Sequence, residues 1–94
     1  MKKGYYAIIP ANVRYDENLT DGAKLLYGEI TALTNEKGYC WASNSYFAEL
    51  YGVSKVTISN WIRQLKKGGY IDSEIKYKEG TKEIDKRYIR ILYD

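Results

Sequence analysis

Residues 44–63, NSYFAELYGVSKVTISNWIR, have the spacing of a helix-turn-helix motif. Ala48, Gly52 and Ile58 stand at the offsets zero, plus four and plus ten that this motif requires. A small residue lets the second helix approach the first, glycine tolerates a positive φ in the turn, and a branched apolar side chain fills the contact. This stretch therefore predicts two short helices joined by a tight turn.

Capping residues set the expected limits of these two helices. Ser43 and Ser54 are predicted to be N-caps, and Gly68-Gly69 are predicted to end the second helix at about Lys67. The inward residues expected on the first helix are Phe47, Ala48, Leu50 and Tyr51. One apolar stripe on the second helix is expected to face the core, namely Ile58, Trp61, Ile62 and Leu65.

Residues 70–92 alternate between polar and apolar positions, with Gly80 in a polar connection, and this predicts an antiparallel hairpin. A helix-turn-helix followed by a hairpin is the order of a winged helix. The expected fold is α+β, a winged helix-turn-helix with a three-helix core, a C-terminal two-stranded β wing and an N-terminal strand or arm. One domain is expected over residues 1–94, with the arm at 1–18, the motif at 43–69 and the wing at 70–93, as the N-terminal domain of a longer protein.

The first helix of the core is predicted upstream of the motif. Thr20 is its expected N-cap, and apolar residues follow at helical spacing: Ala23, Leu26, Tyr27, Ile30 and Leu33. Residues 12–18 are expected to be irregular, residues 35–38 to form the turn that ends the helix, and residues 39–41 to form a short strand.

Residues 4–9, GYYAII, predict a short strand or an extended arm that Pro10 stops. Two roles are open for it. An exposed apolar strand needs a partner, which makes Tyr5, Tyr6, Ile8 and Ile9 candidates for a homodimer contact. Alternatively, Tyr5, Ile8 and Ile9 close the core of their own chain.

Composition excludes several classes of function. The chain has 94 residues, one Cys and no His, so it lacks an internal disulfide and a zinc ligand set, and no metal or cofactor is expected. Cys40 lies between two aromatic residues and is expected to be a buried apolar side chain. Without an activating His or a phosphate-binding loop, the chain is expected not to be an enzyme. No apolar run approaches the roughly 20 residues of a membrane span, and a cytoplasmic location is expected.

Positive charge is concentrated in the second part of the chain. Residues 1–53 hold five Lys and Arg against six Asp and Glu, a balance of −1, whereas residues 54–94 hold ten against six, a balance of +4. This distribution indicates that the second helix of the motif and the hairpin face phosphate, and the alternative is a solvated basic surface.

The face of residues 55–67 opposite the apolar stripe is the predicted DNA-reading surface. The outward residues there are Lys55, Val56, Ser59, Asn60, Arg63 and Lys67, with Thr57 at the boundary. Asn can pair with adenine, Arg with guanine, and Val can contact a thymine methyl group. Base reading is expected from Lys55, Val56, Thr57, Ser59 and Asn60, and Arg63 reaches a base or a phosphate. For Lys66 and Lys67, helix stabilisation and phosphate contact remain open.

Lys55 opposes the positive end of its helix dipole, a conflict that costs about 0.3–1 kcal/mol and that a bound phosphate removes. The alternative is that Lys55 points into water. Further DNA contacts are expected from Ser43, Ser45 and Tyr46 at the start of the first motif helix. The alternative for Tyr46 is a place in the core. In the wing, the expected contacts are Lys76, Lys78, Lys82 and Lys86.

The stretches YAIIPANVRYDENLTDGAKLLYGEI and FAELYGVSKVTISNWIRQLKKGGYI resemble the N-terminal winged-helix domain of RepA_N-type plasmid replication initiators of staphylococci and related Gram-positive bacteria, and of related phage replisome organisers. The resemblance implies binding of repeated double-stranded DNA sites at a replication origin, a homodimer, and recruitment of the replication machinery by a C-terminal domain that is absent here. Two other functions remain open: a transcriptional repressor that binds a promoter operator, and a winged helix used for protein contacts.

Overall fold

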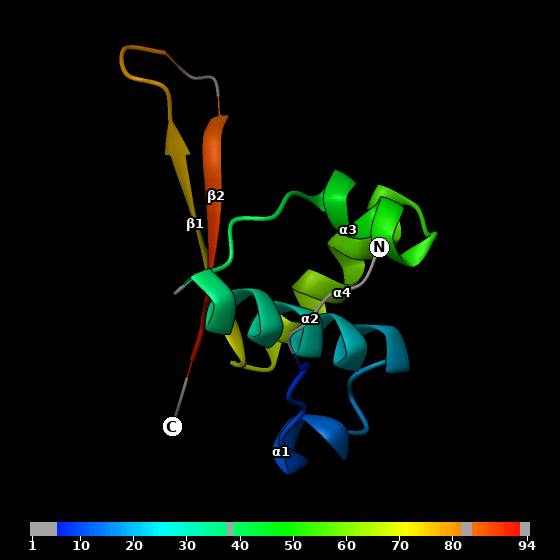
Figure 1. Cartoon of the computed structure of the whole chain (residues 1–94). Coiled ribbons are helices and arrows are strands. Elements are labelled where there is room, and N and C mark those ends of the chain that lie inside the picture. The colour runs from blue at the N-terminus through cyan, green and yellow to red at the C-terminus, as the bar shows by residue number, and fades with distance from the viewer. Residues whose placement is uncertain (1–5, 38, 82–83, 93–94) are drawn as a thin grey trace.

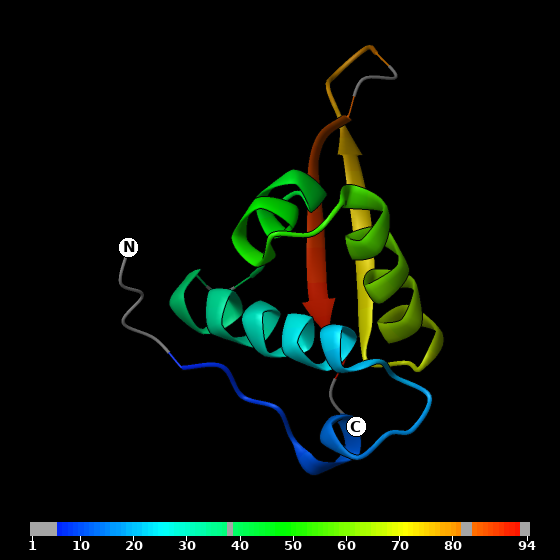
Figure 2. The same cartoon turned by 90° about the vertical axis from the view of Figure 1, so that its right-hand side faces the viewer.

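The computed structural model describes residues 6–37, 39–81 and 84–92, which form a helical unit followed by a β hairpin (Figure 1). In chain order its elements are α1 (Ala11–Arg14), α2 (Asp21–Lys37), α3 (Asn44–Tyr51), α4 (Lys55–Lys67), β1 (Ile71–Tyr77) and β2 (Ile84–Ile91). Figure 2 shows α3 and α4 side by side against the hairpin, with α2 crossing below them. This arrangement confirms the predicted α+β winged helix-turn-helix.

Both motif helices begin at the serines that the sequence predicts. Ser43 Oγ accepts a hydrogen bond from the Tyr46 amide at 3.1 Å, and Ser54 Oγ accepts one from the Thr57 amide at 3.1 Å. Gly52 has a φ of 68°, so α3 ends in a left-handed turn that a side chain would strain. The tight turn that sets the angle between α3 and α4 is therefore built from local signals.

Helix α2 starts at its predicted cap and continues further than predicted. The Ala23 amide donates to Thr20 Oγ1 at 3.3 Å. The expected turn at residues 35–38 is wrong for its first part, because the helix extends to Lys37. Asn, Glu and Lys are all tolerated in a helix interior, and no glycine or proline lies between Leu33 and Gly38.

Two other local predictions are wrong. Residues 11–14 form the one-turn helix α1, within a region predicted to be irregular, because Pro10 starts the turn and Val13 anchors it in the core. Leu50 was expected to face inward but is 39% exposed. At about 100° per residue, Phe47, Ala48 and Tyr51 share one side of α3, and Leu50 lies outside that arc.

The core draws side chains from every element. Its fully buried large members are Phe47, Leu26, Ile30, Ile58, Leu65, Ile71, Ile89, Val13 and Cys40. Trp61 of the predicted stripe is partly buried and packs against the edge of this cluster. Burial raises the pKa of the Cys40 thiol, which agrees with its predicted place as a buried apolar side chain.

The hairpin is antiparallel, with Ile71 opposite Ile91, Ser73 opposite Ile89 and Ile75 opposite Arg87. The predicted strand at residues 39–41 is reduced to one bridge, in which the Ile89 amide donates to the Cys40 carbonyl at 2.6 Å. The base of the hairpin is thus part of the core, whereas its outer half extends beyond the helices (Figure 2).

The described part of the N-terminal segment, residues 6–10, is an extended arm without strand pairing. Thr31 Oγ1 accepts from the Ile8 amide at 2.9 Å and lies 3.2 Å from the Ile8 carbonyl oxygen. Ile9 packs against the core, whereas Tyr6 and Ile8 are exposed. Tyr5 lies outside the described residues.

Candidate nucleic-acid interface

The outer face of α4 is set by the burial of its opposite face. Ile58, Ile62 and Leu65 are buried, which turns the remaining positions away from the core. Five of the predicted DNA-reading residues are exposed: Lys55, Val56, Asn60, Arg63 and Lys67. Thr57 and Ser59 are partly buried. The sequence of α4, KVTISNWIRQLKK, contains no acidic residue, so this face carries only positive charge from its own helix.

Two of the exposed residues are already paired with each other. Arg63 Nη1 donates a hydrogen bond to Asn60 Oδ1 at 2.9 Å. Thr57 is instead turned toward the helix cap, where its hydroxyl lies 3.0 Å from Ser54 Oγ. Asn60 and Arg63 are therefore exposed polar groups that are linked to each other on the outer face of α4.

Lys55 stands at the first position of α4, as predicted, and is exposed. Ser54 satisfies the Thr57 amide, but the amides of Lys55 and Val56 lie before the first intrahelical hydrogen bond. Free amides and a cation at a helix N-terminus together favour an anion such as a backbone phosphate.

At the start of α3, Ser43 and Ser45 are exposed and can reach a phosphate. Tyr46 differs from them, because its ring packs edge to face on Phe47 with a centroid separation of 5.6 Å and contacts the core. Packing thus favours the core role that the sequence left open for Tyr46.

Arg87 joins the wing to the start of α3. Its guanidinium donates to Asn44 Oδ1 and to the Ala42 carbonyl, the latter at 2.7 Å. Burial lowers the pKa of this guanidinium below its ordinary value. The sequence alone does not indicate this role for Arg87, because its two partners lie 43 and 45 residues away along the chain.

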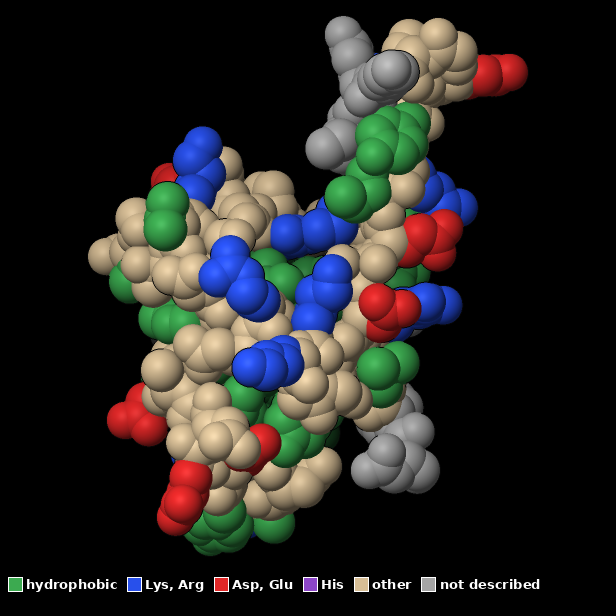
Figure 3. Space-filling model, turned by 180° about the vertical axis from the view of Figure 1, so that it is seen from behind, with side chains coloured by type: hydrophobic (Ala, Val, Ile, Leu, Met, Phe, Trp, Pro, Cys, Tyr) green, Lys and Arg blue, Asp and Glu red, His purple; other side chains and the backbone are tan. Residues whose placement is uncertain are grey.

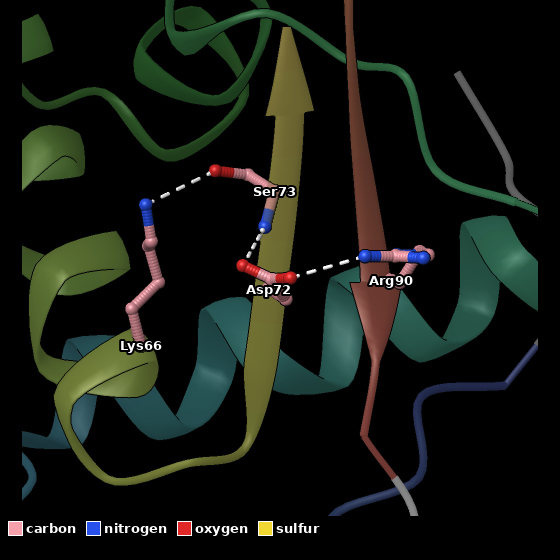
Figure 4. A network of polar contacts seen from close by, with 4 residues as sticks. All are labelled: Lys66, Asp72, Ser73 and Arg90. Carbon is pink, nitrogen blue, oxygen red and sulfur yellow. Dashed lines mark hydrogen bonds and ion pairs between the residues drawn. The ribbon is translucent and has the colours of Figure 1, made fainter.

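A second set of polar contacts joins α4 to the wing (Figure 4). Lys66 Nζ donates to Ser73 Oγ at 3.2 Å, the Ser73 amide donates to Asp72 Oδ1 at 2.9 Å, and Arg90 pairs with Asp72 at 3.0 Å. Lys66 therefore connects α4 to β1 of the wing, a role that the sequence did not indicate. Lys67, by contrast, is exposed on the outer face.

The predicted wing lysines do not share one location. Lys76 Nζ lies 5.5 Å from the centroid of the Tyr88 ring, on the face of β1 opposite to Ser73. Lys78 is exposed beyond the end of β1. Lys82 is outside the described residues, and for Lys86 the structure describes only the backbone, which pairs with Lys76.

A shallow depression lies along the C-terminal half of α4, on the side of the wing. It has a volume of about 610 Å³ and is lined by Ser59, Ile62, Arg63, Lys66 and Lys67. Figure 3 shows basic side chains gathered around the hollow between the helices and the hairpin, with hydrophobic side chains of the hairpin beside them. The basic surface is thus continuous from α4 toward the wing.

A capped second motif helix with an acid-free outer face, held against a β wing, defines a winged helix-turn-helix DNA-binding domain. The comparison with known families agrees, because residues 17–71, more than half of the chain, match the family described as helix-turn-helix domain. The chain belongs to this family, and its partner is double-stranded DNA. No curated protein and no solved structure matches the chain significantly. Among the described residues, no helix combines the length and apolar character needed to cross a bilayer, and no three metal-binding side chains cluster.

Proposed function

We propose that this domain binds repeated sites in double-stranded DNA at a plasmid replication origin and so takes part in the initiation of replication. The observation that supports it best is the outer face of α4, which carries three basic residues, Lys55, Arg63 and Lys67, and no acid. With α4 in the major groove, its N-terminal half presents Lys55, Val56, Ser59 and Asn60 to base edges. The function proposed is binding, without catalysis.

The choice of an origin over a promoter rests on the resemblance to RepA_N-type initiators. The two resembling stretches, residues 6–30 and 47–71, cover α1, most of α2 and α3, and all of α4. They therefore include much of the helical unit as well as the reading helix. A transcriptional repressor would use the same helix on DNA, so the chemistry of α4 alone does not separate the two functions.

Footprinting of the source replicon with this domain tests the proposal. Protection of several direct repeats within the origin is the expected result. Protection of one palindrome at a promoter, with none at the origin, would show a repressor. A third outcome is a winged helix that contacts only protein, and a salt titration detects it. Duplex binding must weaken with a log–log slope of about −0.9 per neutralised phosphate, whereas a protein contact has no such requirement.

The resemblance also supports a homodimer and recruitment of replication proteins by a further domain. Tyr6 is 86% exposed and Ile8 is 54% exposed, so the arm offers apolar surface to a second copy. Sedimentation of the protein and of the variant Ile8→Lys tests the dimer. A concentration-dependent dimer that Ile8→Lys dissociates is expected, and a monomer at all concentrations would exclude this role for the arm.

A further inference from the structure

The two faces of β1 have different surroundings. Side chains alternate along a strand, so Ile71, Ser73, Ile75 and Tyr77 share one face. Ile71 is buried in the core and Ser73 accepts from Lys66 of α4, which shows that this face is the one turned toward the helices. We call it the inner face of the wing.

Lys76 belongs to the outer face. Its ammonium lies over Tyr88, and the Tyr88 ring packs edge to face on Tyr39 at a centroid separation of 5.5 Å. The pairing of β1 with β2 shifts after Lys76, where Tyr77 lies opposite Ile84 and Lys76 opposite Lys86. The extra residue is on β2, so the alternation along β1 is kept up to Tyr77. Of the wing positions on β1, the inner face therefore carries Ile75 and Tyr77 and not a lysine.

Ile75 and Tyr77 are 45% and 57% exposed, although both lie on the face whose lower half is buried. The last four residues of β1, 74–77, are all exposed, and the outer half of the hairpin extends past the helices (Figure 2). Ser73, on the same face of β1, accepts a hydrogen bond from Lys66, which is one of the basic residues that line the depression on α4. Two exposed apolar side chains close to basic residues suit the surface of a duplex. The apolar side chains can contact the sugars that form the sides of a groove, and the basic residues can contact the phosphates beside them.

We propose that Ile75 and Tyr77 are the wing residues that contact DNA, and that they pack against the deoxyribose walls of the minor groove next to the major groove entered by α4. This inference rests on the proposed placement of α4 on double-stranded DNA. In this arrangement the wing contributes apolar contacts with deoxyribose and not ion pairs with phosphate. Sugar contact carries no base code by itself, but it depends on the width of the minor groove, so the wing favours sites by their shape.

Salt dependence separates this contact from a phosphate contact. Loss of a phosphate contact lowers the magnitude of the log–log salt slope by about 0.9, whereas loss of an apolar contact lowers affinity and leaves the slope unchanged. The probe is a duplex that carries the footprinted repeat, with a random duplex of equal length beside it. The wild-type chain, Tyr77→Ala, Ile75→Ala, Lys76→Ala and Lys67→Ala are titrated with both duplexes at several salt concentrations.

Tyr77→Ala and Ile75→Ala are each expected to weaken binding about tenfold on the footprinted duplex, the effect of removing one apolar side chain from an interface, with the wild-type slope retained. Lys76→Ala, the matched control on the outer face, should bind like the wild type, and Lys67→Ala should reduce the slope. Thermal melts show whether each variant is folded, and Tyr77→Phe, which keeps the ring, should retain most of the affinity.

Two results would overturn the inference: wild-type affinity of folded Tyr77→Ala and Ile75→Ala, or a reduced slope for Lys76→Ala. If the two alanine variants bind DNA normally but lose a protein partner, the inner face is a protein-docking surface. Failure of the origin assignment gives a different result. The wild-type chain would then protect no origin repeat, but the wing variants would still bind more weakly than the wild type to the duplexes that the wild type does bind. A wild-type chain that binds no duplex would remove both proposals.

Discussion

Arg63 Nη1 donates a 2.9 Å hydrogen bond to Asn60 Oδ1 on the exposed face of α4. The bond uses one of the two lone pairs of the Asn60 amide oxygen, so the oxygen can still accept from adenine while the amide group donates to it. It leaves the Asn60 amide donor and the other edge of the Arg63 guanidinium for bases. The two predicted reading residues are therefore coupled, because Arg63 orients the Asn60 side chain that is proposed to pair with a base.

Alanine substitutions at these two positions are expected to be non-additive. Asn60→Ala and Arg63→Ala should each cost about 1–3 kcal/mol on the specific site, and the double variant should cost less than the sum by about 0.5 kcal/mol or more. Fluorescence anisotropy with one labelled duplex measures all four proteins of the cycle.

Asn60→Asp sharpens this test, because it keeps the oxygen that accepts from Arg63 and removes the amide donor. If Asn60 reads a base, the Asp variant should lose preference at one position of the site. Additive losses in the double variant would show that the bond in the free protein has no role in recognition. Equal losses on random DNA would assign both residues to phosphate.

The local features of the fold could be predicted because their causes are close in sequence. Ser43 and Ser54 cap helices that begin one residue later, and Gly52 ends α3 through its own backbone conformation. The inward stripe of α4 follows from helical periodicity alone, which is why five of the six residues predicted to face outward are exposed, whereas Ser59 is partly buried.

The tertiary partners could not be predicted, since nothing in the local pattern encodes them. Arg87 and Asn44 are 43 residues apart, and Lys66 meets Ser73 only because the hairpin folds back along α4. Alternation along β1 groups Ser73, Ile75 and Tyr77 on one face, but which face meets the helices depends on this folding back. Lysines of the wing were therefore expected to contact DNA as a group, although Lys76 lies on the outer face.

Arg87→Met tests whether the tie between β2 and the start of α3 positions the wing. Methionine keeps the length and apolar stem but leaves the Ala42 carbonyl and Asn44 without their donor. Hydrogen bonds from a charged, partly buried group contribute about 1.5–3 kcal/mol each, so urea denaturation should show a loss of this order. Binding to specific and random duplexes should fall together, because the wing would no longer be held beside α3.

Arg90→Met is the matched control for Arg87→Met on the same strand. Arg90 pairs with Asp72 in solvent, where the two side chains are 60% and 48% exposed, so its loss should cost no more than about 1 kcal/mol. Equal destabilisation by the two substitutions would contradict the structural role given to Arg87.

Gly22→Ala is expected to destabilise the fold even though alanine favours helices. A Cβ at this position in the first turn of α2 would collide with the Trp61 indole ring atoms Cζ2 and Cε2. Trp61 also packs edge to face on Tyr51, so a shift of its ring would disturb this second contact. Overpacking of this kind costs about 1–3 kcal/mol, measurable as a lower urea midpoint at an unchanged slope.

Trp61→Leu in the Gly22→Ala background removes the colliding ring. This double variant should be destabilised less than the sum of the two single variants. Strict additivity would mean that the glycine is not needed for the approach of the indole ring.

Asp16 makes the stability of the domain sensitive to acid. The Tyr70 hydroxyl donates to Asp16 Oδ2 at 2.6 Å and the Asn18 amide donates to Oδ1 at 2.8 Å, and both bonds favour the charged carboxylate. They lower the pKa of Asp16 below its ordinary 3.8, Tyr70 more than Asn18. Because the folded pKa is the lower one, the stabilisation is present above pH 3.8 and is lost as the pH falls through the folded pKa.

Tyr70→Phe isolates this contribution, because it removes the hydroxyl and keeps the ring that packs edge to face on Tyr27 at 6.3 Å. Urea midpoints of the wild type and the variant, measured from pH 7 to about pH 2, should differ most above pH 3.8 and converge below it. A constant difference over the whole range would mean that the hydroxyl acts through its approach to the Asn12 carbonyl, 3.0 Å away, and not through the carboxylate. Asp16 lies before α2 and Tyr70 follows α4, so their hydrogen bond connects the segments on either side of α2, α3 and α4. Convergence of the urea midpoints at low pH would show that this bond stabilises the fold only while Asp16 is charged.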